Sequence, residues 1–168
     1  MRVVIVGCGR TGAMLAELLD AAGHAVLVMD VRTSAFDRLP ESFGGEAVRG
    51  DGIDEGVLRR AGAAEADVFM FLTEGDNRNI MGAQVARDTL RPQRVFAKVN
   101  DPVRAEAYSE LGITTVCRTT MVADALLAAI GQPATGIPGL FERPEPITGG
   151  TGHGARPVGQ AADAAGEG

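Results

Sequence analysis

The sequence predicts an α/β fold, a Rossmann-like doubly wound parallel sheet that forms a single domain with a flexible C-terminal tail. Short β-branched or aromatic runs alternate with helix-length segments of helical apolar spacing, which is typical of this fold class. A glycine-rich turn joins the first run to the first helix-length segment. After about Gly131 the periodic segments end, so we expect the folded domain to cover residues 1–133.

Six runs have the character of buried parallel strands, and the segments between them have that of amphipathic helices. The expected strands cover residues 3–6, 25–29, 46–49, 68–72, 95–99 and 114–117. The expected helices cover residues 12–22, 54–61, 77–90, 102–111 and 120–130. Right-handed crossovers distribute these helices over the two faces of the sheet, and the loops at the carboxyl ends of the strands form the ligand edge.

Residues 134–168 are dominated by Gly, Pro, Ala and Thr. Such a segment buries too little apolar surface to offset the conformational entropy that folding removes. We therefore expect a mostly disordered tail, in which Ile137, Leu140 and Phe141 are the candidates for local docking on the domain.

The composition argues against nucleic-acid binding and against a membrane span. The formal net charge is −6 at pH 7, and the positive residues are spread along the chain rather than clustered in a basic stripe. No apolar run approaches the roughly 20 residues of a membrane span, and the first residues do not resemble a signal peptide. Cys8 and Cys117 fit neither a disulfide framework nor a metal-ligand spacing. We expect a cytosolic protein without a metal site.

The turn after the first expected strand has the spacing Gly7-x-Gly9-x-x-Gly12. Gly7 permits the tight turn, Gly9 lets the backbone approach a pyrophosphate, and Gly12 lets the helix pack closely against the strand. The free N–H groups and the positive end of a helix that starts near Arg10 then hold the phosphates. The predicted contacts in this loop are Gly7, Cys8, Gly9, Arg10, Thr11 and Gly12.

Asp30 ends the second expected strand, 18 residues after Gly12. A carboxylate at this position accepts hydrogen bonds from both hydroxyls of an adenosine ribose and repels a 2′-phosphate. Arg32, two positions later, is a predicted contact that instead favours a phosphorylated dinucleotide. On balance we favour NAD(H), or an adenine nucleotide such as ATP or ADP, over NADP(H).

Each of these residues also has a structural interpretation. The glycines can form a turn without a ligand, and Asp30 can be a solvated loop carboxylate. Arg10 is as often a solvated side chain as a phosphate clamp. Cys8 is more often a small loop filler than a redox switch, although a helix N-terminus would lower its pKa.

Beyond these motifs, the chain resembles the nucleotide-binding N-terminal domain of bacterial potassium-transport regulators, the TrkA-N, KTN or RCK domain. The resemblance covers roughly residues 1–130. It rests on the order and spacing of VVIVGCGRTG, VMD, GDG, ADVFMFLTEGDNRN, AKVNDP and LGI. It implies that the Gly50-Asp51 turn lies beside the adenine and that the loop 73–79 lies beside the pyrophosphate and the distal part of the ligand.

The residues that the resemblance adds to the predicted site are Asp51, Gly52, Thr73, Asp76, Asn77 and Lys98. Each of the acidic and amide residues has an alternative role. Asp51 can stabilise its own Gly-Asp-Gly turn, and Asp76 or Asn77 can cap the following helix. Lys98 stands where the family often has an arginine, at an edge where a cation can reach a phosphate.

Two departures from the family pattern bear on function. The family usually opens its final helix with a Pro-Glu pair, but residues 117–120 read Cys-Arg-Thr-Thr. The family's regulators commonly carry a second ligand-binding domain, and the predicted tail stands in its place. We therefore do not expect a signal that acts through a second domain of this chain.

The resemblance implies a non-enzymatic, cytoplasmic regulatory subunit that changes conformation or assembly with bound nucleotide and docks on a membrane potassium transporter subunit. It also implies a homo-oligomer, or a hetero-assembly with a longer TrkA-like companion. The helix over residues 120–130 offers a candidate seam at Met121, Val122, Leu126 and Leu127, although packing on the core explains these residues equally well.

Two enzyme classes use a similar turn. A small NAD(P)-dependent oxidoreductase needs a proton donor beside the nicotinamide, but the only tyrosine, Tyr108, lacks a lysine four residues later. A methyl transferase usually has an acidic residue before the glycines, where this chain has Val6. We therefore prefer the regulatory interpretation and keep the oxidoreductase as its alternative.

Overall fold

The computed structural model describes residues 1–141, which form a seven-stranded sheet in the order β3-β2-β1-β4-β5-β6-β7. The first six strands in sequence are mutually parallel, and β7 pairs antiparallel to β6. The strands are β1 (Arg2–Val6), β2 (Ala25–Asp30), β3 (Glu46–Arg49), β4 (Val68–Phe71), β5 (Arg94–Lys98), β6 (Thr114–Val116) and β7 (Leu140–Phe141). The predicted Rossmann-like sheet is confirmed.

The α-helices are α1 (Arg10–Ala21), α2 (Glu55–Arg60), α3 (Asp76–Val85), α4 (Pro102–Glu110) and α5 (Arg118–Ala129). Two 3₁₀ turns, Thr33–Arg38 and Ala63–Glu65, join strands and helices, and the π-helical turn Ala86–Leu90 continues α3. None of the helices within residues 1–141 is both long and apolar enough to cross a bilayer.

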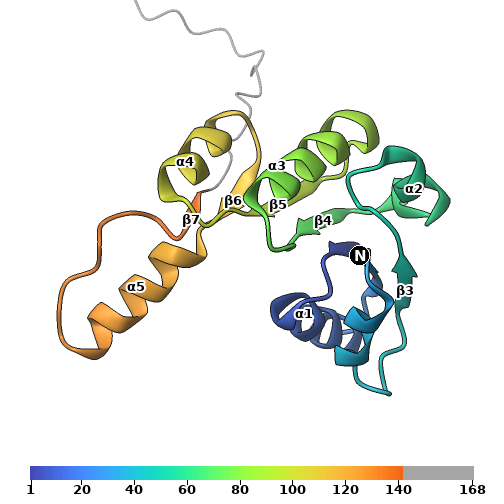
Figure 1. Ribbon diagram of the computed structural model, residues 1–168, viewed down its shortest axis with the longest axis horizontal. Coiled ribbons are helices and arrows are strands. Elements are labelled where there is room, and N and C mark those ends of the chain that lie inside the picture. Colours follow the sequence, from blue (N-terminus) through green and yellow to red (C-terminus); the bar gives the residue numbers. More distant parts are fainter. Residues whose placement is uncertain (142–168) are drawn as a thin grey trace, which may run out of the picture.

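Two apolar clusters fill the two faces of the sheet. One face packs Leu58 of α2, Ile80 of α3 and Ala105 of α4 against the strands, and the other packs Ala13 and Ala16 of α1. Figure 1 shows this division, with α2, α3 and α4 on one side of the strands and α1 on the other. The sheet is covered on both faces, as the nearly continuous apolar runs of its parallel strands require.

The strand order reverses between β1 and β4. From β1 the chain adds β2 and β3 on one side, and from β4 it adds β5 and β6 on the other, so the loops that follow β1 and β4 lead to opposite sides. A crevice at the carboxyl ends of such strands is the usual ligand site of a doubly wound sheet. The fold therefore predicts a ligand site at the carboxyl ends of β1, β2 and β4.

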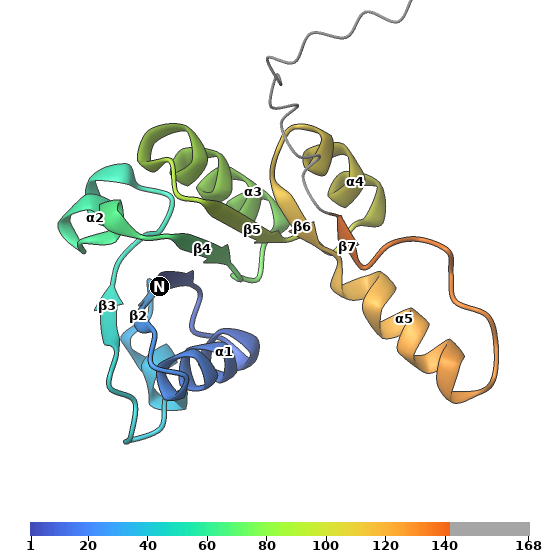
Figure 2. The ribbon, with the colours of Figure 1, turned by 180° about the vertical axis from the view of Figure 1, so that it is seen from behind.

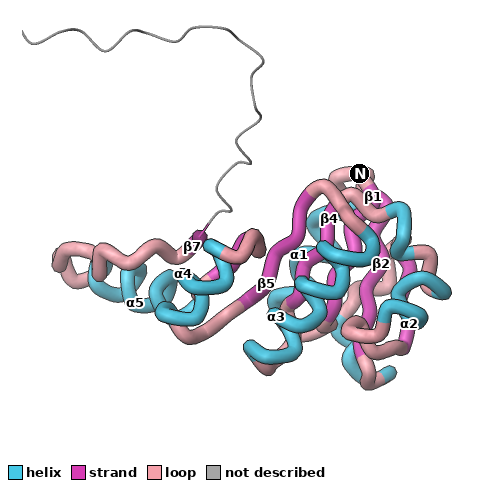
Figure 3. Tube along the Cα trace, turned by 90° about the horizontal axis from the view of Figure 1, so that it is seen from above, coloured by secondary structure: helices cyan, strands magenta, loops and turns pink. Residues whose placement is uncertain are grey.

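The last helix differs from the others in its burial. Only Thr120 of α5 is buried, and Figures 1 and 2 show α5 extending away from the rest of the molecule. Seen from above in Figure 3, α4, α5 and β7 lie together at one end. The chain after α5 returns along the helix, where the N–H of Thr135 donates to Asp124 at 2.7 Å.

The first residues of the predicted tail are part of the folded domain in the structure. Leu140 and Phe141 form β7 at the edge of the sheet, and Phe141 packs against the main apolar cluster. This extends the sheet beyond the expected boundary at residue 133 and fits the expected local docking of these two residues. Residues 142–168 lie outside the part of the chain that the structure describes.

Candidate functional site

The turn between β1 and α1 contains two glycines that the backbone requires. Gly7 has φ +108°, and a Cβ there would lie 2.9 Å from the backbone nitrogen of Thr73. A Cβ on Gly12 would overlap the carbonyl oxygen of Gly7. Both positions therefore exclude side chains because strand, turn and helix approach so closely, which matches the roles predicted for them.

Gly9 is different, because an added Cβ there meets no atom within 4 Å. It lies immediately before the first turn of α1, and no side chain caps the free N–H groups of that turn. The open space beside Gly9 therefore adjoins the uncapped backbone N–H groups of the first turn of α1. An anion approaching α1 along its axis would reach these N–H groups without steric hindrance.

Asp30 ties the end of β2 to the glycine turn. Its two carboxylate oxygens accept hydrogen bonds from the backbone N–H groups of Cys8 and Arg32, each at 2.9 Å. Its side chain is 11% exposed, so it is not the freely solvated loop carboxylate considered above. The guanidinium of Arg32 lies 3.9 Å from Asp30 and remains mostly exposed.

Cys8 is buried beneath this turn. Burial raises the pKa of the Cys8 thiol, and the neighbouring charge of Asp30 raises it further. The pKa of this thiol is therefore raised despite its place before α1, because desolvation and the Asp30 carboxylate both disfavour the thiolate. A protonated, buried thiol fits the loop-filler interpretation of Cys8.

A pocket of about 210 Å³ opens at the carboxyl edge of β1, β2 and β4. Of the predicted site residues, six line it: Gly7, Gly9, Asp30, Arg32, Gly52 and Thr73. Eight further residues complete the lining: Val6, Met29, Val31, Gly50, Leu72, Glu74, Gly75 and Arg78. The pocket combines an apolar wall with a carboxylate and a glycine turn, as a ligand with an apolar ring, a sugar and phosphates would need.

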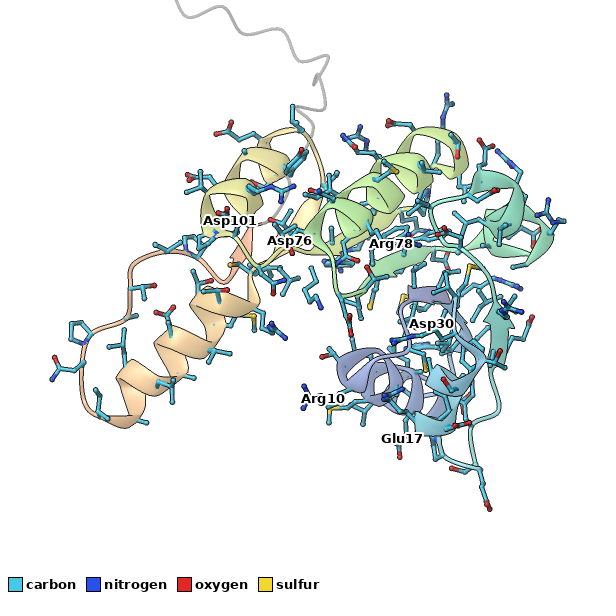
Figure 4. All side chains as sticks on the ribbon, viewed as in Figure 1. Arg10, Glu17, Asp30, Asp76, Arg78 and Asp101 are labelled. Carbon is cyan, nitrogen blue, oxygen red and sulfur yellow. The ribbon has the colours of Figure 1, made fainter. Side chains whose placement is uncertain are left out.

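Cys8, Arg10, Thr11, Gly12, Asp51, Asp76, Asn77 and Lys98 do not line the pocket. Cys8 and Gly12 lie beneath the turn, whereas Arg10 and Thr11 are exposed in the first turn of α1. Figure 4 shows Arg10 projecting outward from α1. The structure thus separates the predicted residues into a group at the pocket and a group around it.

Arg78 bridges the pocket from the second half of the sheet to the first. Its guanidinium donates to Asp51 at 2.5 Å, and the same carboxylate oxygen accepts the N–H of Ile53 at 3.2 Å. Asp51 therefore does stabilise its own turn and is also ion-paired. Sequence reasoning missed Arg78, and an exposed arginine in a helix offers no pattern that would have singled it out.

Asn79 holds the ends of β4 and β5 together. Its side-chain oxygen accepts the N–H and the hydroxyl of Thr73, at 2.8 and 2.7 Å. Its side-chain nitrogen donates to the carbonyls of Thr73 and Lys98, at 3.1 and 2.8 Å. The side chain is fully buried. Sequence reasoning overlooked this role, although a polar residue on the same helix face as Ile80 and Ala83 must be hydrogen-bonded.

Asp76 contacts the loop at residues 100–101 and Asn77 contacts α4, and neither lines the pocket. Asp76 accepts hydrogen bonds from the backbone and side chain of Asn100, at 3.0 and 2.8 Å, and from the N–H of Asp101. Asn77 accepts one from Arg104 at 2.6 Å. Neither caps α3, because Gly75 is its N-cap residue and makes no side-chain cap. The capping role predicted for them is wrong.

Lys98 ends β5 beside this loop and is half-buried. The pKa of its ammonium group is lowered by burial and then by Arg118, whereas Asp76 and Glu74 act in the opposite direction. Lys98 therefore lies near charged groups at the start of α3 and at the start of α5.

The model of the TrkA-N domain matches residues 3–119, which is more than half of the chain and includes the glycine turn, Asp30 and the loop 73–79. The chain belongs to the TrkA-N domain family. This match confirms the predicted resemblance.

Among the curated relatives, the Trk system potassium uptake protein TrkA of Streptomyces coelicolor is 46% identical over 127 residues, which are 76% of this chain and 57% of that protein. The chain spans about half the length of several curated relatives that it matches.

Two solved structures share the fold. The TrkA-N domain of the Escherichia coli inner membrane protein ybaL has a TM-score of 0.68 at 22% identity, over 77% of this chain and 96% of that one. The Shewanella denitrificans Kef C-terminal domain in its AMP-bound form has a TM-score of 0.62 at 22% identity, over 79% and 83% of the two chains.

Proposed function

We propose that this chain is a nucleotide-sensing regulatory subunit of a membrane potassium uptake system. The observation that carries the proposal is the pocket at the glycine turn of a TrkA-N domain, in a chain 46% identical to a potassium uptake protein over the matched region. The pocket offers donors for phosphates at α1 and a carboxylate for ribose hydroxyls at Asp30. The ligand is an adenine nucleotide, either NAD(H) or ADP and ATP.

Regulation requires the nucleotide to bind two arrangements of the protein unequally. The bonds of Asn79 and Asp76 connect the pocket loop to the ends of β5 and to the start of α4. A ligand that moves the loop 72–75 therefore shifts groups outside the pocket. The partners in this proposal are a membrane potassium transporter subunit and either further copies of this chain or a longer TrkA-like companion, at the cytoplasmic face of the membrane.

The chemistry of the pocket supports a regulator over the alternative, a small NAD(P)-dependent oxidoreductase. Among residues 1–141, no tyrosine, histidine or lysine lines the pocket to donate a proton beside a nicotinamide. In the proposal, the bound nucleotide therefore acts as a signal and is not consumed.

Potassium uptake by cells that produce either the wild-type chain or Gly9→Val tests the proposal. We expect the uptake rate of cells with Gly9→Val to differ from the wild-type rate and to match that of cells without the chain. Equal uptake in all three would contradict the regulatory role. Turnover of a nicotinamide nucleotide by the purified chain would favour the oxidoreductase.

A further inference from the structure

Two arginines line the pocket, one after β2 and one on α3. Arg32 lies beside Asp30 at the end of β2. Arg78 reaches from α3 to Asp51, in the turn between β3 and α2, and donates a hydrogen bond to its carboxylate. Asp51 itself does not line the pocket. The ion pair therefore holds the guanidinium of Arg78 at the pocket, while its carboxylate partner stays outside the lining.

We infer that Arg78 contacts the base of the bound nucleotide and that Asp51 is the residue that positions it. This inference rests on the proposed function and adds to its site a contact from α3. A guanidinium offers a base both a planar face and N–H donors. Both residues then affect nucleotide affinity, Arg78 directly and Asp51 only through Arg78.

The first support is that the guanidinium of Arg78 keeps most of its hydrogen-bonding capacity. A guanidinium has five N–H donors, and within residues 1–141 the side chain of Arg78 bonds only to Asp51. The carboxylate oxygen that accepts this bond also accepts the N–H of Ile53 at 3.2 Å, which fixes it to its turn. Arg78 is thus anchored through one nitrogen, and its other donors are free for a ligand.

The second support is that Arg78 and the phosphate donors belong to different faces of the sheet. The uncapped N–H groups that suit phosphates are those of α1. α1 packs on one face of the sheet, whereas α2 and α3 pack on the other (Figure 1). The ion pair joins α3 to the turn that leads into α2. The part of the ligand beside Arg78 is therefore remote from phosphates held at α1.

The third support is that the turn that holds Arg78 adjoins apolar residues of the lining. A Cβ on Gly50 would lie 3.3 Å from the sulfur of Met29, and a Cβ on Gly52 would overlap the side chain of Val6. Met29 and Val6 both line the pocket. An apolar surface beside a guanidinium suits a base, whose faces pack on both, better than it suits a phosphate.

Calorimetric titration of the wild-type chain and Arg78→Ala with AMP, ADP and ATP tests the base contact. We expect Arg78→Ala to weaken all three nucleotides by the same factor, about tenfold, because the base is common to them. A loss that grows from AMP to ATP would mean that Arg78 binds phosphate. That result, or no loss, would overturn the inference.

Arg59→Ala is the matched control. Arg59 forms an ion pair with Glu55 on α2, the two side chains are 49% and 42% exposed, and Arg59 does not line the pocket. Arg78 and Asp51 are 45% and 40% exposed. Exposed ion pairs add little to stability, so both variants should fold. We expect Arg59→Ala to bind the nucleotides as the wild type does, and an equal weakening in both variants would contradict a contact at Arg78.

Asp51→Asn tests the positioning role, since its amide oxygen can still accept the N–H of Ile53 while Arg78 loses its charged partner. We expect Asp51→Asn to weaken ADP in the otherwise wild-type chain and to cause no further loss in the Arg78→Ala background. An equal loss in both backgrounds would show that Asp51 acts independently of Arg78, and the positioning role would fail.

The same titrations separate this inference from the proposed function. If ADP binds the wild type and Arg78→Ala equally well, the role of Arg78 is refuted while the proposed function stands. If AMP, ADP, ATP and NAD⁺ all fail to bind the wild-type chain, the proposed function fails and the role of Arg78 with it.

Discussion

Gly9 and Gly12 lie three residues apart in one turn and carry different constraints. A Cβ on Gly12 would overlap the backbone of the turn, whereas a Cβ on Gly9 would have no protein atom within 4 Å. Gly9 has φ −79° and ψ −173°, a conformation open to any residue. Folding therefore requires a glycine at position 12, whereas the glycine at position 9 is required only for ligand binding in this account.

Gly9→Val is expected to leave the free energy of unfolding within about 0.5 kcal/mol of wild type, since a Cβ at this position has no protein atom within 4 Å. The same side chain fills the approach to the phosphates, so binding of ADP and NAD⁺ should be lost. Denaturant unfolding and calorimetry measure the two effects. Gly12→Val, the matched variant, should unfold the domain; retained nucleotide affinity in Gly9→Val would refute the phosphate site.

Cys8 makes the free energy of unfolding depend on pH. Its pKa is raised in the folded chain, mainly because the thiolate would be buried and also because Asp30 is near. Above the ordinary thiol pKa of about 8.5 the unfolded chain loses this proton while the folded chain keeps it, so the stabilisation present at lower pH is lost as pH rises.

We therefore expect the free energy of unfolding of the wild type to fall more steeply between about pH 8 and pH 10 than that of Cys8→Ala. Urea unfolding at several pH values measures both slopes, and groups common to the two proteins cancel in the difference. Identical slopes would mean that the Cys8 thiol ionises equally in the folded and unfolded chains.

At the scale of elements, the join between β4, α3 and β5 depends on one buried amide. Asn79 makes four hydrogen bonds there, whereas the exposed Asn77 in the same turn makes one, to Arg104. Removing a buried group leaves its former partners unsatisfied, and the cost is about 1–3 kcal/mol for each.

Asn79→Ala is expected to lower the free energy of unfolding by at least about 2 kcal/mol, because the backbone groups of Thr73 and Lys98 lose their partner. Asn77→Ala should change it by less than about 0.5 kcal/mol. Chemical denaturation of both variants provides the comparison. An equal, small effect in the two would show that the buried amide does not hold these strands together.

The order of the elements was predictable because each parallel strand is an apolar run bounded by a helical pattern, and the glycine turn marked β1 and α1. Two kinds of feature were not. β7 has only two residues and depends on pairing with β6, which no local pattern encodes. The partners of Asp76 and Arg78 are 24 to 27 residues away in sequence, so their bonds follow from the tertiary arrangement.

At the scale of the whole molecule, α5 leaves an apolar surface uncovered among the described residues. Met121, Val122, Leu126 and Ile130 are between 51% and 71% exposed, and the helix extends away from the sheet. Packing of these residues on the core, considered above for Met121, Val122 and Leu126, does not occur. The exposed face supports the proposal that copies of this chain, or a companion, pack against α5.

If copies of the chain assemble through α5, Leu126→Asp should shift the wild-type oligomer toward monomer, because a charge would then be buried in the contact. Val103→Asp on α4, where the native side chain is 76% exposed, is the matched control and should leave the assembly unchanged. Sedimentation analysis gives the masses. An oligomer that survives Leu126→Asp would exclude this face as the contact.

The central claim is that the glycine edge of this domain binds an adenine nucleotide as a signal. The most direct test is the Tm of the chain with NAD⁺, NADH, NADP⁺, NADPH, ATP, ADP and S-adenosylmethionine, since a ligand that binds only the folded state raises the Tm with its concentration. We predict stabilisation by NAD(H), ADP or ATP, without turnover. A dominant response to NADP(H) or S-adenosylmethionine, or no response to any of them, would contradict this account.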